Sequence, residues 1–451
     1  MMLKTRFKKF FTADFRGLLK DSTWAFAGMV ATSGLYFVEV MLLARYFSQE
    51  LLGVYFLIIS FPELVQQVLD VRVKEIMVRY LALFVGQGEK RKAVALIKFL
   101  WLLDVGVALL AMVLVMLLSG VVSSALFLDS GYASLMILYA VGMLFEALDS
   151  ASGPILRVFG RFDLAFLASL LIALVRIGVI ALAMGWDTGL SGLIFARVLV
   201  FVFSTLFLGY LSLKIAWREL GDHFHTPLNE LRSMYRELVG FAFQVNISST
   251  LKTLVSKLDV MIVGLILGEA SVAVYKITTQ LAKTLLLFSD PLSMAVYPRF
   301  SLLFSQNQPK LMNALIKRLT FIMVMGVVPL LVGVFLFRHT LLVAFAGEAY
   351  QENTLPFVFA TWGIAFALVF FWVRPYGLSL GLAGLLTKSM LISASVSLLG
   401  LVFLTWLYGE TGAAIGFGLF YALTIMVQLF FISTQSGKRG LSLAIPLDAK
   451  S

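Results

Sequence analysis

Long apolar windows run through almost the whole chain and constrain its fold more than any other feature. A helix needs about 20 apolar residues to cross the hydrocarbon core of a bilayer. Windows of that length indicate twelve membrane spans, at residues 24–44, 51–71, 98–119, 132–152, 164–185, 190–212, 240–265, 271–296, 317–337, 355–376, 386–408 and 411–433. The composition is 60% hydrophobic and 14% charged, whereas soluble domains are about 25% charged. We therefore expect an all-α polytopic membrane protein.

The distribution of lysine and arginine between these spans predicts the orientation of the chain. Basic residues concentrate in alternate segments, namely the N-terminus, 72–98, 157–161, 214–236, 299–318 and the tail. The other connections are short and nearly free of them. The positive-inside rule then places both termini in the cytoplasm, and the basic N-terminus is expected as a retained surface helix. Because the net charge of +11 follows this topology, we expect no nucleic-acid partner.

Several kinds of chemistry are excluded by what the sequence lacks. The chain has no cysteine and only three histidines, which excludes disulfides, thiol catalysis and cysteine metal sites. It also has no GxxxxGK[ST] loop to hold the phosphates of ATP. No catalytic constellation, metal site or cofactor site is expected, and the chain is not expected to be an enzyme.

The second half of the chain repeats the first at an offset of about 220 residues. The matches are Glu39 with Asp259, Tyr55 with Tyr275, Asp70 with Asp290 and Arg79 with Arg299. Six spans per copy is an even number, so both copies insert with the same orientation, as parallel repeats. We expect two six-helix lobes, at residues 1–212 and 237–451, joined by a cytoplasmic linker at 213–236.

Polar side chains recur on single faces of the seventh and eighth predicted spans. In the eighth, Lys276, Lys283 and Asp290 follow one another at steps of seven residues, a spacing that keeps them on one helix face. An ionised residue at the centre of a membrane helix costs roughly 2.5 to 3.5 kcal/mol, so such residues line water-filled cavities or pair within the bundle. The expected cavity cations are Lys252, Lys276, Lys283, Arg374 and Arg176. A cationic cavity suits an anionic substrate.

Several charges have a simpler structural interpretation. Lys257, Lys388, Arg72 and Arg197 lie near predicted helix ends, from where long side chains reach the headgroups. Glu146 and Asp149 are interpreted as ion-pair partners of Arg176 or Arg157. The remaining acids are candidates for binding a coupling ion, and these are Glu39, Asp70, Asp259 and Asp290.

Short segments of the sequence resemble a known family. The stretches RYFSQELLGVY (residues 45–55) and DVRVKEIMVRYLA (70–82) resemble the opening of Wzx-like flippases. These form the polysaccharide transporter branch of the multidrug/oligosaccharidyl-lipid/polysaccharide exporter (MOP) superfamily, whose fold is MATE-like. The segments 258–281 and YPRF (297–300) are similar to the family's seventh and eighth spans. One departure is DVRV at 70–73, where the family often has a DLGL-like sequence, so that Arg72 replaces a glycine.

The resemblance implies a function that the residues alone do not specify. It implies transport of an undecaprenyl-pyrophosphate-linked oligosaccharide from the cytoplasmic to the outer leaflet of a bacterial inner membrane, by alternating access. The expected products are surface polysaccharides such as O-antigen or exopolysaccharide. The partners that it implies are the lipid-linked oligosaccharide, membrane lipids, and polysaccharide polymerase and chain-length proteins.

Two alternatives remain open at this stage. A multidrug cation antiporter of the same superfamily would need an acidic cavity, for which Glu39, Asp259 and Asp290 are candidates. A non-transporting scaffold of a polysaccharide synthesis complex would be favoured if the polar stripes were completely paired in salt bridges.

Overall fold

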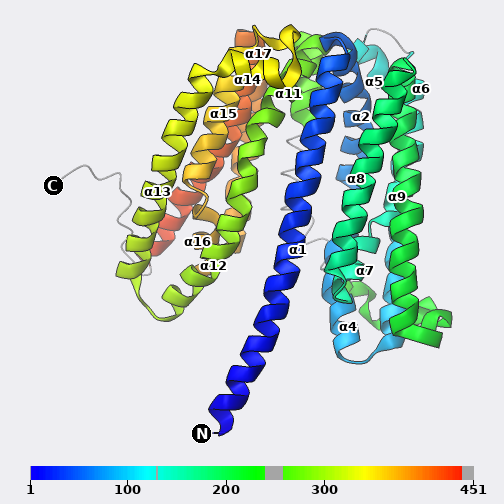
Figure 1. Cartoon of the computed structure of the whole chain (residues 1–451), viewed down its shortest axis with the longest axis vertical. Coiled ribbons are helices and arrows are strands. Elements are labelled where there is room, and N and C mark those ends of the chain that lie inside the picture. Colours follow the sequence, from blue (N-terminus) through cyan, green and yellow to red (C-terminus); the bar gives the residue numbers. More distant parts are fainter. Residues whose placement is uncertain (1, 128–130, 239–256, 439–451) are drawn as a thin grey trace. The chain divides into compact units, whose positions relative to one another are not determined.

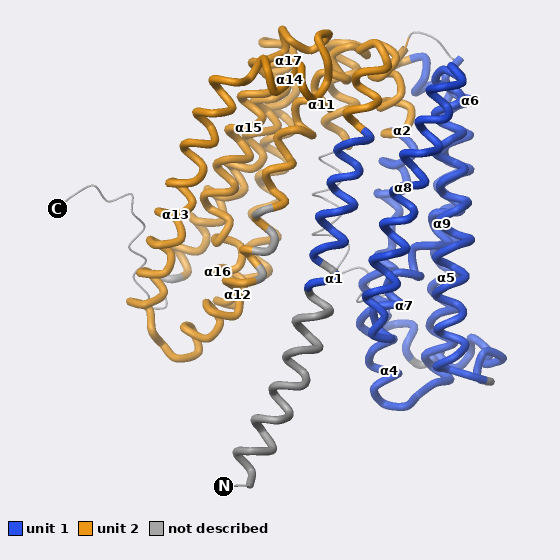
Figure 2. The backbone as a smooth tube through the Cα atoms, viewed as in Figure 1, with its two compact units in different colours: residues 1–39, 61–124, 129–247 blue, residues 40–60, 125–128, 248–451 orange. Residues whose placement is uncertain are grey.

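The computed structural model describes residues 2–127, 131–238 and 257–438, and within these ranges every regular element is helical (Figure 1). The chain begins with α1 (Met2–Tyr46) and α2 (Gln49–Leu69), so the predicted N-terminal surface helix continues directly into the first span. The structure forms two compact units (Figure 2). Unit 1 comprises residues 1–39, 61–124 and 129–247, and unit 2 comprises 40–60, 125–128 and 248–451. The lobe bounds expected from the repeat stay a prediction.

Nine helices in the described ranges are long and apolar enough to cross a membrane. They cover the first six predicted spans and the ninth to the twelfth, with the last two merged into one stretch, Ala383–Gln435. That stretch lies in α17 (Ala383–Lys438), which is interrupted at Gly409 by a backbone conformation of φ 59° and ψ −138°. This positive φ suits glycine and separates the two predicted spans. The seventh predicted span lies largely outside the described residues.

The eighth predicted span differs from a single straight helix. It is divided into α11 (Glu269–Lys283), a 3₁₀ stretch η4 (Thr284–Phe288) and α12 (Ser289–Ser305). Neither α-helix is among the nine apolar spans. Each of the two α-helices is too short on its own, at 15 and 17 residues, because η4 divides the segment.

Unit 1 is a helical bundle in which small residues allow close packing. It contains α5 (Lys90–Phe127), α6 (Ala133–Asp149), α7 (Ser152–Val158), α8 (Phe162–Gly185) and α9 (Gly189–Leu220). A Cβ atom on Gly142 of α6 would lie 2.9 Å from a methyl carbon of Val198 on α9. The absence of a side chain at Gly142 therefore lets these two helices approach closely, as is common where membrane helices pack.

The expected linker packs into unit 1. After α9 the chain forms two short 3₁₀ helices, η2 (Gly221–His225) and η3 (Leu228–Met234). Leu231 and Leu238 are buried in one core with Val73 and Ile76, which belong to α3 (Val73–Ile76). Lys98 of α5 donates hydrogen bonds to the backbone carbonyls of Phe224 and Thr226.

A further contact ties this segment to the π-helical turn η1 (Met77–Leu81), which is followed by α4 (Ala82–Gly86). The Tyr80 hydroxyl donates a hydrogen bond of 3.0 Å to the Glu237 carboxylate. Burial, together with this hydrogen bond, raises the pKa of Tyr80 above its usual value. Residues 221–238 are thus an integral part of unit 1.

Arg72 occupies a position whose backbone favours glycine. It precedes α3 with φ 56° and ψ 44°, in the left-handed region, which costs a non-glycine residue roughly 1–2 kcal/mol. Asp70 partly offsets this strain, because its carboxylate accepts a 2.8 Å hydrogen bond from the Arg72 backbone N–H and forms a 3.4 Å ion pair with the guanidinium. A glycine at this position would adopt the same backbone conformation without that cost.

Unit 2 is built around α15 (Thr354–Val369), α16 (Val373–Ser379) and α17, with α13 (Pro309–Leu336) and α14 (Arg338–Ala346) beside them. A Cβ atom on Gly363 of α15 would lie 2.2 Å from the Cα of Gly418 on α17. The added Cβ atom is fixed to the backbone of α15, and the Cα atom belongs to the backbone of α17, so neither can move aside. The two helices therefore cross with no room for a side chain.

Residues 40–60 complete unit 2 from the start of the chain. Arg45 donates a hydrogen bond to the carbonyl of Ala344, and Gln49 donates one of 2.7 Å to the carbonyl of Ala349, which lies in the short helix η5 (Glu348–Tyr350). The turn between α1 and α2 is thereby held against the segment that joins α14 to α15.

The Gly363 crossing predicts a specific loss of stability. Gly363→Ala should lower the thermal unfolding midpoint in detergent by several degrees, because overpacking a close contact costs about 1–3 kcal/mol. Gly326→Ala in α13 is the matched control, since a Cβ atom there meets nothing within 4 Å, and an alanine inside a helix is intrinsically favoured over glycine. Equal midpoints for the two variants, measured by tryptophan fluorescence, would contradict the described crossing.

Candidate functional site

Two lysines on α11 face aromatic rings inside unit 2. The Lys276 ammonium lies 5.8 Å from the ring centroid of Phe56, and the Lys283 ammonium lies 5.0 Å from that of Phe417. Both side chains are partly buried. Cation–π contacts of this kind are worth about 0.5–2 kcal/mol, more where water is excluded. The rings of Phe56 and Phe417 thus stabilise two positive charges on α11, which packs inside unit 2.

A buried acid lies within electrostatic range of both lysines. Asp259, in the helical stretch 257–267, is 4% exposed. Its carboxylate accepts hydrogen bonds of 2.7 Å from the Tyr275 hydroxyl and from the backbone N–H of Val260. The charges of Lys283 and Lys276 both act on it. The arrangement is a buried acid with two hydrogen-bond donors and two neighbouring cations.

The surroundings of this group are apolar and tightly packed. The ring of Tyr275 meets that of Phe417 edge-on at 6.4 Å, and Phe417 meets Tyr421 at 5.2 Å. A Cβ atom on Gly53 of α2 would lie 1.7 Å from the carbonyl oxygen of Glu269, so α2 and the start of α11 are in direct backbone contact. In such a low-dielectric setting charges interact more strongly than in water.

In unit 1 a second buried acid is neutralised by two arginines. Glu39 of α1 is 1% exposed, and its carboxylate lies 2.6 Å from Arg176 Nε of α8 and 3.4 Å from Arg197 Nη2 of α9. Neither contact has the alignment of a hydrogen bond, so both are ion pairs by distance. The Arg176 guanidinium also lies 5.7 Å from the ring centroid of Tyr36.

These contacts correct two interpretations from the sequence. Arg197 does not reach toward the headgroups, because it pairs with Glu39. Glu146 and Asp149 were expected to pair with Arg176 or Arg157, yet neither acid forms an ion pair within the described residues. Arg176, an expected cavity cation, is engaged by Glu39 inside unit 1.

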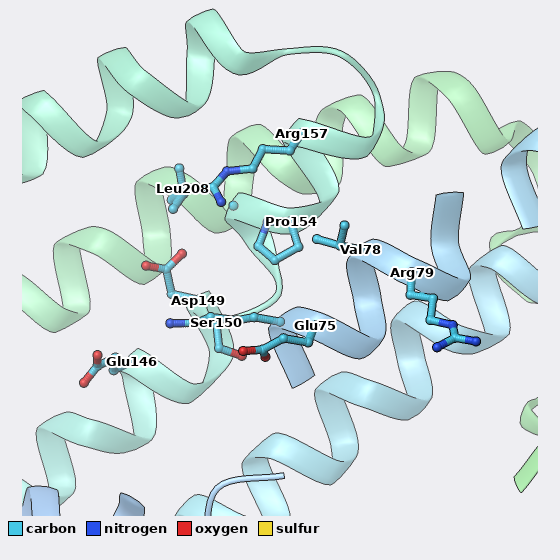
Figure 3. Close-up of a pocket in the computed structure, with 11 residues that line it drawn as sticks. Glu75, Val78, Arg79, Glu146, Asp149, Ser150, Pro154, Arg157 and Leu208 are labelled. Atoms are coloured by element: carbon cyan, nitrogen blue, oxygen red, sulfur yellow. The ribbon is translucent and has the colours of Figure 1, made fainter. Parts of the chain in front are cut away.

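Glu146 and Asp149 instead line a pocket of about 630 Å³ in unit 1 (Figure 3). Its walls come from α3 and η1 on one side and from α6, α7 and α9 on the other. The charged residues that line it are Lys74, Glu75, Arg79, Glu146, Asp149 and Arg157. The sequence analysis did not single out this group as a site, although Lys74, Arg79 and Arg157 all lie in basic segments that it marked.

The remaining predicted site residues lie on other elements or outside what is described. Arg374 lies on α16 with an exposed side chain, and Asp70 pairs with Arg72. Asp290 belongs to α12. Lys252 lies outside the described residues. Within the described ranges, no group of three or more histidine, aspartate or glutamate side chains is placed to hold a metal ion.

Nine helices long and apolar enough to cross a membrane, with charged groups inside each unit, define a polytopic α-helical membrane protein within the described residues. The family model for polysaccharide biosynthesis proteins matches residues 81–355. The chain belongs to that family. No curated protein matches the chain.

Solved structures of the MOP superfamily share the fold. An inward-facing multidrug resistance MATE family transporter is 14% identical, with a TM-score of 0.70, over 94% of this chain and 96% of its own. The lipid II flippase MurJ, in an inward closed conformation, is 18% identical, with a TM-score of 0.67, over 92% and 87%. An outward-facing multidrug resistance MATE family transporter is 16% identical, with a TM-score of 0.59, over 94% and 96%. At such identities the likeness concerns the fold.

The ion pairs of Glu39 predict a large destabilisation by a small change. Glu39→Gln should lower stability by about 3–5 kcal/mol, because removing one partner of a buried pair leaves the other charges uncompensated. Asp163→Asn is the control, since Asp163 pairs with Arg161 where the side chains are 41% and 37% exposed, and such pairs are worth about 1 kcal/mol or less. Thermal unfolding of the purified variants in detergent measures both.

A double variant separates charge from packing. If the loss in Glu39→Gln comes from uncompensated arginine charge, adding Arg176→Gln should recover part of it. Additive losses in the double variant would show that charge compensation is not the cause.

Proposed function

We propose that the protein moves an undecaprenyl-pyrophosphate-linked oligosaccharide from the cytoplasmic to the outer leaflet of a bacterial inner membrane by alternating access. The observation that carries this proposal is the pair Lys276 and Lys283, two cations on a helix packed among aromatic rings. Membership of the polysaccharide biosynthesis protein family and the shared fold with a protein named as a lipid II flippase support it. Both termini would lie in the cytoplasm.

Lysine suits the task of capturing and then releasing a phosphate group. The lysine ammonium is a mobile, strongly hydrated point charge, whereas arginine holds phosphate oxygens by a rigid, bidentate fork. A transporter must release its substrate as well as bind it. Several weak attractions from lysines therefore favour turnover, and we propose that Lys252 and Arg374 contribute to the same cationic path.

A multidrug cation antiporter is the second candidate, favoured by the shared fold with MATE transporters. Such a protein needs an acid with room beside it for an organic cation, which is far larger than a sodium ion or a proton. Glu39 is already matched by two arginines, and Asp259 accepts two hydrogen bonds and lies within range of two lysines. These contacts disfavour the antiporter.

A scaffold that does not transport would show no flipping activity after reconstitution.

The cationic pair predicts a loss of transport without a loss of protein. Lys276→Ala combined with Lys283→Ala should abolish or greatly reduce surface glycan in a strain that lacks its own flippase, while the amount of protein in the membrane stays near normal. Lys310→Ala in α13 is the control, because this side chain is exposed. Surface glycan is measured by gel and by lectin or antibody staining.

A conservative change tests whether charge is the requirement. Lys283→Arg should keep part of the activity, since the charge and the contact with Phe417 can both persist. Lys257→Ala, near a predicted helix end, should be much milder than Lys276→Ala. Wild-type surface glycan in the double alanine variant at wild-type protein level would refute the proposed role.

We further propose that a sodium ion or a proton on an acid returns the empty transporter to its starting state. Of the four candidates, Glu39 and Asp70 already form ion pairs with arginine. This leaves Asp259 as the better candidate, beside Asp290, whose surroundings are not described. Moving one charge through the membrane potential is worth roughly 2.3 kcal/mol per 100 mV.

The coupling proposal predicts that Asp259→Asn transports without responding to an imposed ion gradient. Purified protein in proteoliposomes, with sodium, proton or potential gradients applied one at a time, gives the measurement. Asp163→Asn, an acid in an exposed ion pair, is the control. Wild-type transport that persists with neither an ion gradient nor a potential would rule out both forms of coupling.

A further inference from the structure

The pocket of unit 1 has features of a second binding site that the proposed transport does not use. It is formed by two connections that the lysine and arginine distribution predicts to be cytoplasmic, one between α2 and α5 and one between α6 and α8. Its volume of about 630 Å³ lies within the usual range of small-molecule sites. On the predicted topology the pocket lies at the depth of the cytoplasmic headgroups.

The charges around this pocket are mixed in sign and separated in space. Three cations and three acids line it. Figure 3 shows Glu146 and Arg79 on opposite sides of the site, with Arg157 at the top of the view and Asp149 between Arg157 and Glu146. Lys74 acts electrostatically on Glu146, Asp149 and the nearby Asp104. Acids thus outnumber cations at this end of the pocket.

Asp149 supplies an acceptor that the protein does not use. Its Oδ2 accepts a 2.5 Å hydrogen bond from the Ser204 hydroxyl. Its Oδ1 is buried and has no hydrogen-bond partner within the described residues. The Ser152 hydroxyl lies near this carboxylate without an aligned hydrogen bond to Oδ1. A buried carboxylate oxygen without a donor is energetically costly, so a ligand that donates a hydrogen bond is favoured there.

Arg157 supplies the complementary group for an anion. It comes from α7, its side chain is exposed, and it forms no ion pair within the described residues. Figure 3 shows its guanidinium directed from α7 toward Leu208 and Asp149. Guanidinium binds phosphate oxygens through paired hydrogen bonds. The apolar residues Val78, Pro154 and Leu208 complete the lining.

We propose that this pocket binds a zwitterionic group that carries a phosphate diester and a primary ammonium, as in a phosphatidylethanolamine head group. The ammonium donates to Asp149 Oδ1 beside Glu146, and the phosphate accepts from Arg157. A primary ammonium can donate these hydrogen bonds, whereas the quaternary ammonium of phosphatidylcholine cannot. The same chemistry occurs in soluble glycerophosphoethanolamine, so the experiment distinguishes lipid from soluble ligand.

The test compares lipids that differ only in the head group. Purified full-length protein in detergent is titrated with phosphatidylethanolamine, phosphatidylcholine and phosphatidylglycerol of identical acyl chains, with native mass spectrometry and thermal shift as readouts. The wild type should bind phosphatidylethanolamine at least about tenfold more tightly than phosphatidylcholine, the size expected for one charge-assisted hydrogen bond. Competition by glycerophosphoethanolamine at equal affinity would assign a soluble ligand, and its failure would assign the lipid.

Variants separate the two ends of the site. Asp149→Asn should bring the ratio of the affinities for phosphatidylethanolamine and phosphatidylcholine close to one. Glu146→Gln should lower this ratio in the same direction, and it provides the test if Asp149→Asn folds poorly. Arg157→Gln should weaken both lipids alike. Arg161→Gln, which lies outside the pocket and pairs with Asp163, should change nothing.

Binding is measured without transport. If phosphatidylethanolamine does not bind, the flippase proposal still stands, and if transport fails, the proposed lipid site still stands. A wild type that binds phosphatidylethanolamine no more tightly than the other two lipids would overturn the inference. So would an unchanged lipid preference in well-folded Asp149→Asn and Glu146→Gln.

Discussion

The need to neutralise charge inside the bilayer organises both units. Water is absent from the hydrocarbon core, so an ionised group there is stable only beside groups that compensate it. Glu39 is almost completely buried and meets two arginines from α8 and α9, which ties three helices of unit 1 together. In unit 2, Asp259 accepts a hydrogen bond from a tyrosine hydroxyl and lies within electrostatic range of two lysines. The helices that carry these residues are fixed by their partners as much as by apolar packing.

The two units compensate their acids by different means, and the difference has chemical consequences. In unit 1 the partner is the arginine guanidinium, which keeps its charge under all physiological conditions. In unit 2 the nearby cations are lysines that also contact the rings of Phe56 and Phe417. A lysine with an aromatic contact on one side and an acid within range can shift between them, or toward a bound anion, by rotating its flexible stem. We infer that unit 1 is the more rigid electrostatic element.

Sequence patterns predicted the membrane spans, which depend on local length and periodicity. Most of the apolar spans are confirmed because bilayer thickness sets their length, and α17, which joins the last two spans, contains the predicted boundary, at Gly409. The ion pairs between charged side chains were harder to predict. Arg176 lies on a face that suits a cavity, and nothing in the pattern indicates that Glu39, far away in sequence, would lie 2.6 Å from it. The left-handed conformation of Arg72 was likewise hidden, because an arginine rarely adopts a positive φ. The predicted cavity between the lobes stays a prediction.

The segment after α9 affects how the protein is made. Leu231 and Leu238 complete a core whose other members include Val73 and Ile76, so this part of unit 1 cannot close until translation has passed residue 238. Unit 2 has the reverse order, since residues 40–60 belong to it but leave the ribosome long before their partners at 344 and 349. The first hairpin must therefore wait in the membrane before the partners of its turn have been made. The insertion machinery or a chaperone has the opportunity to hold it during that interval.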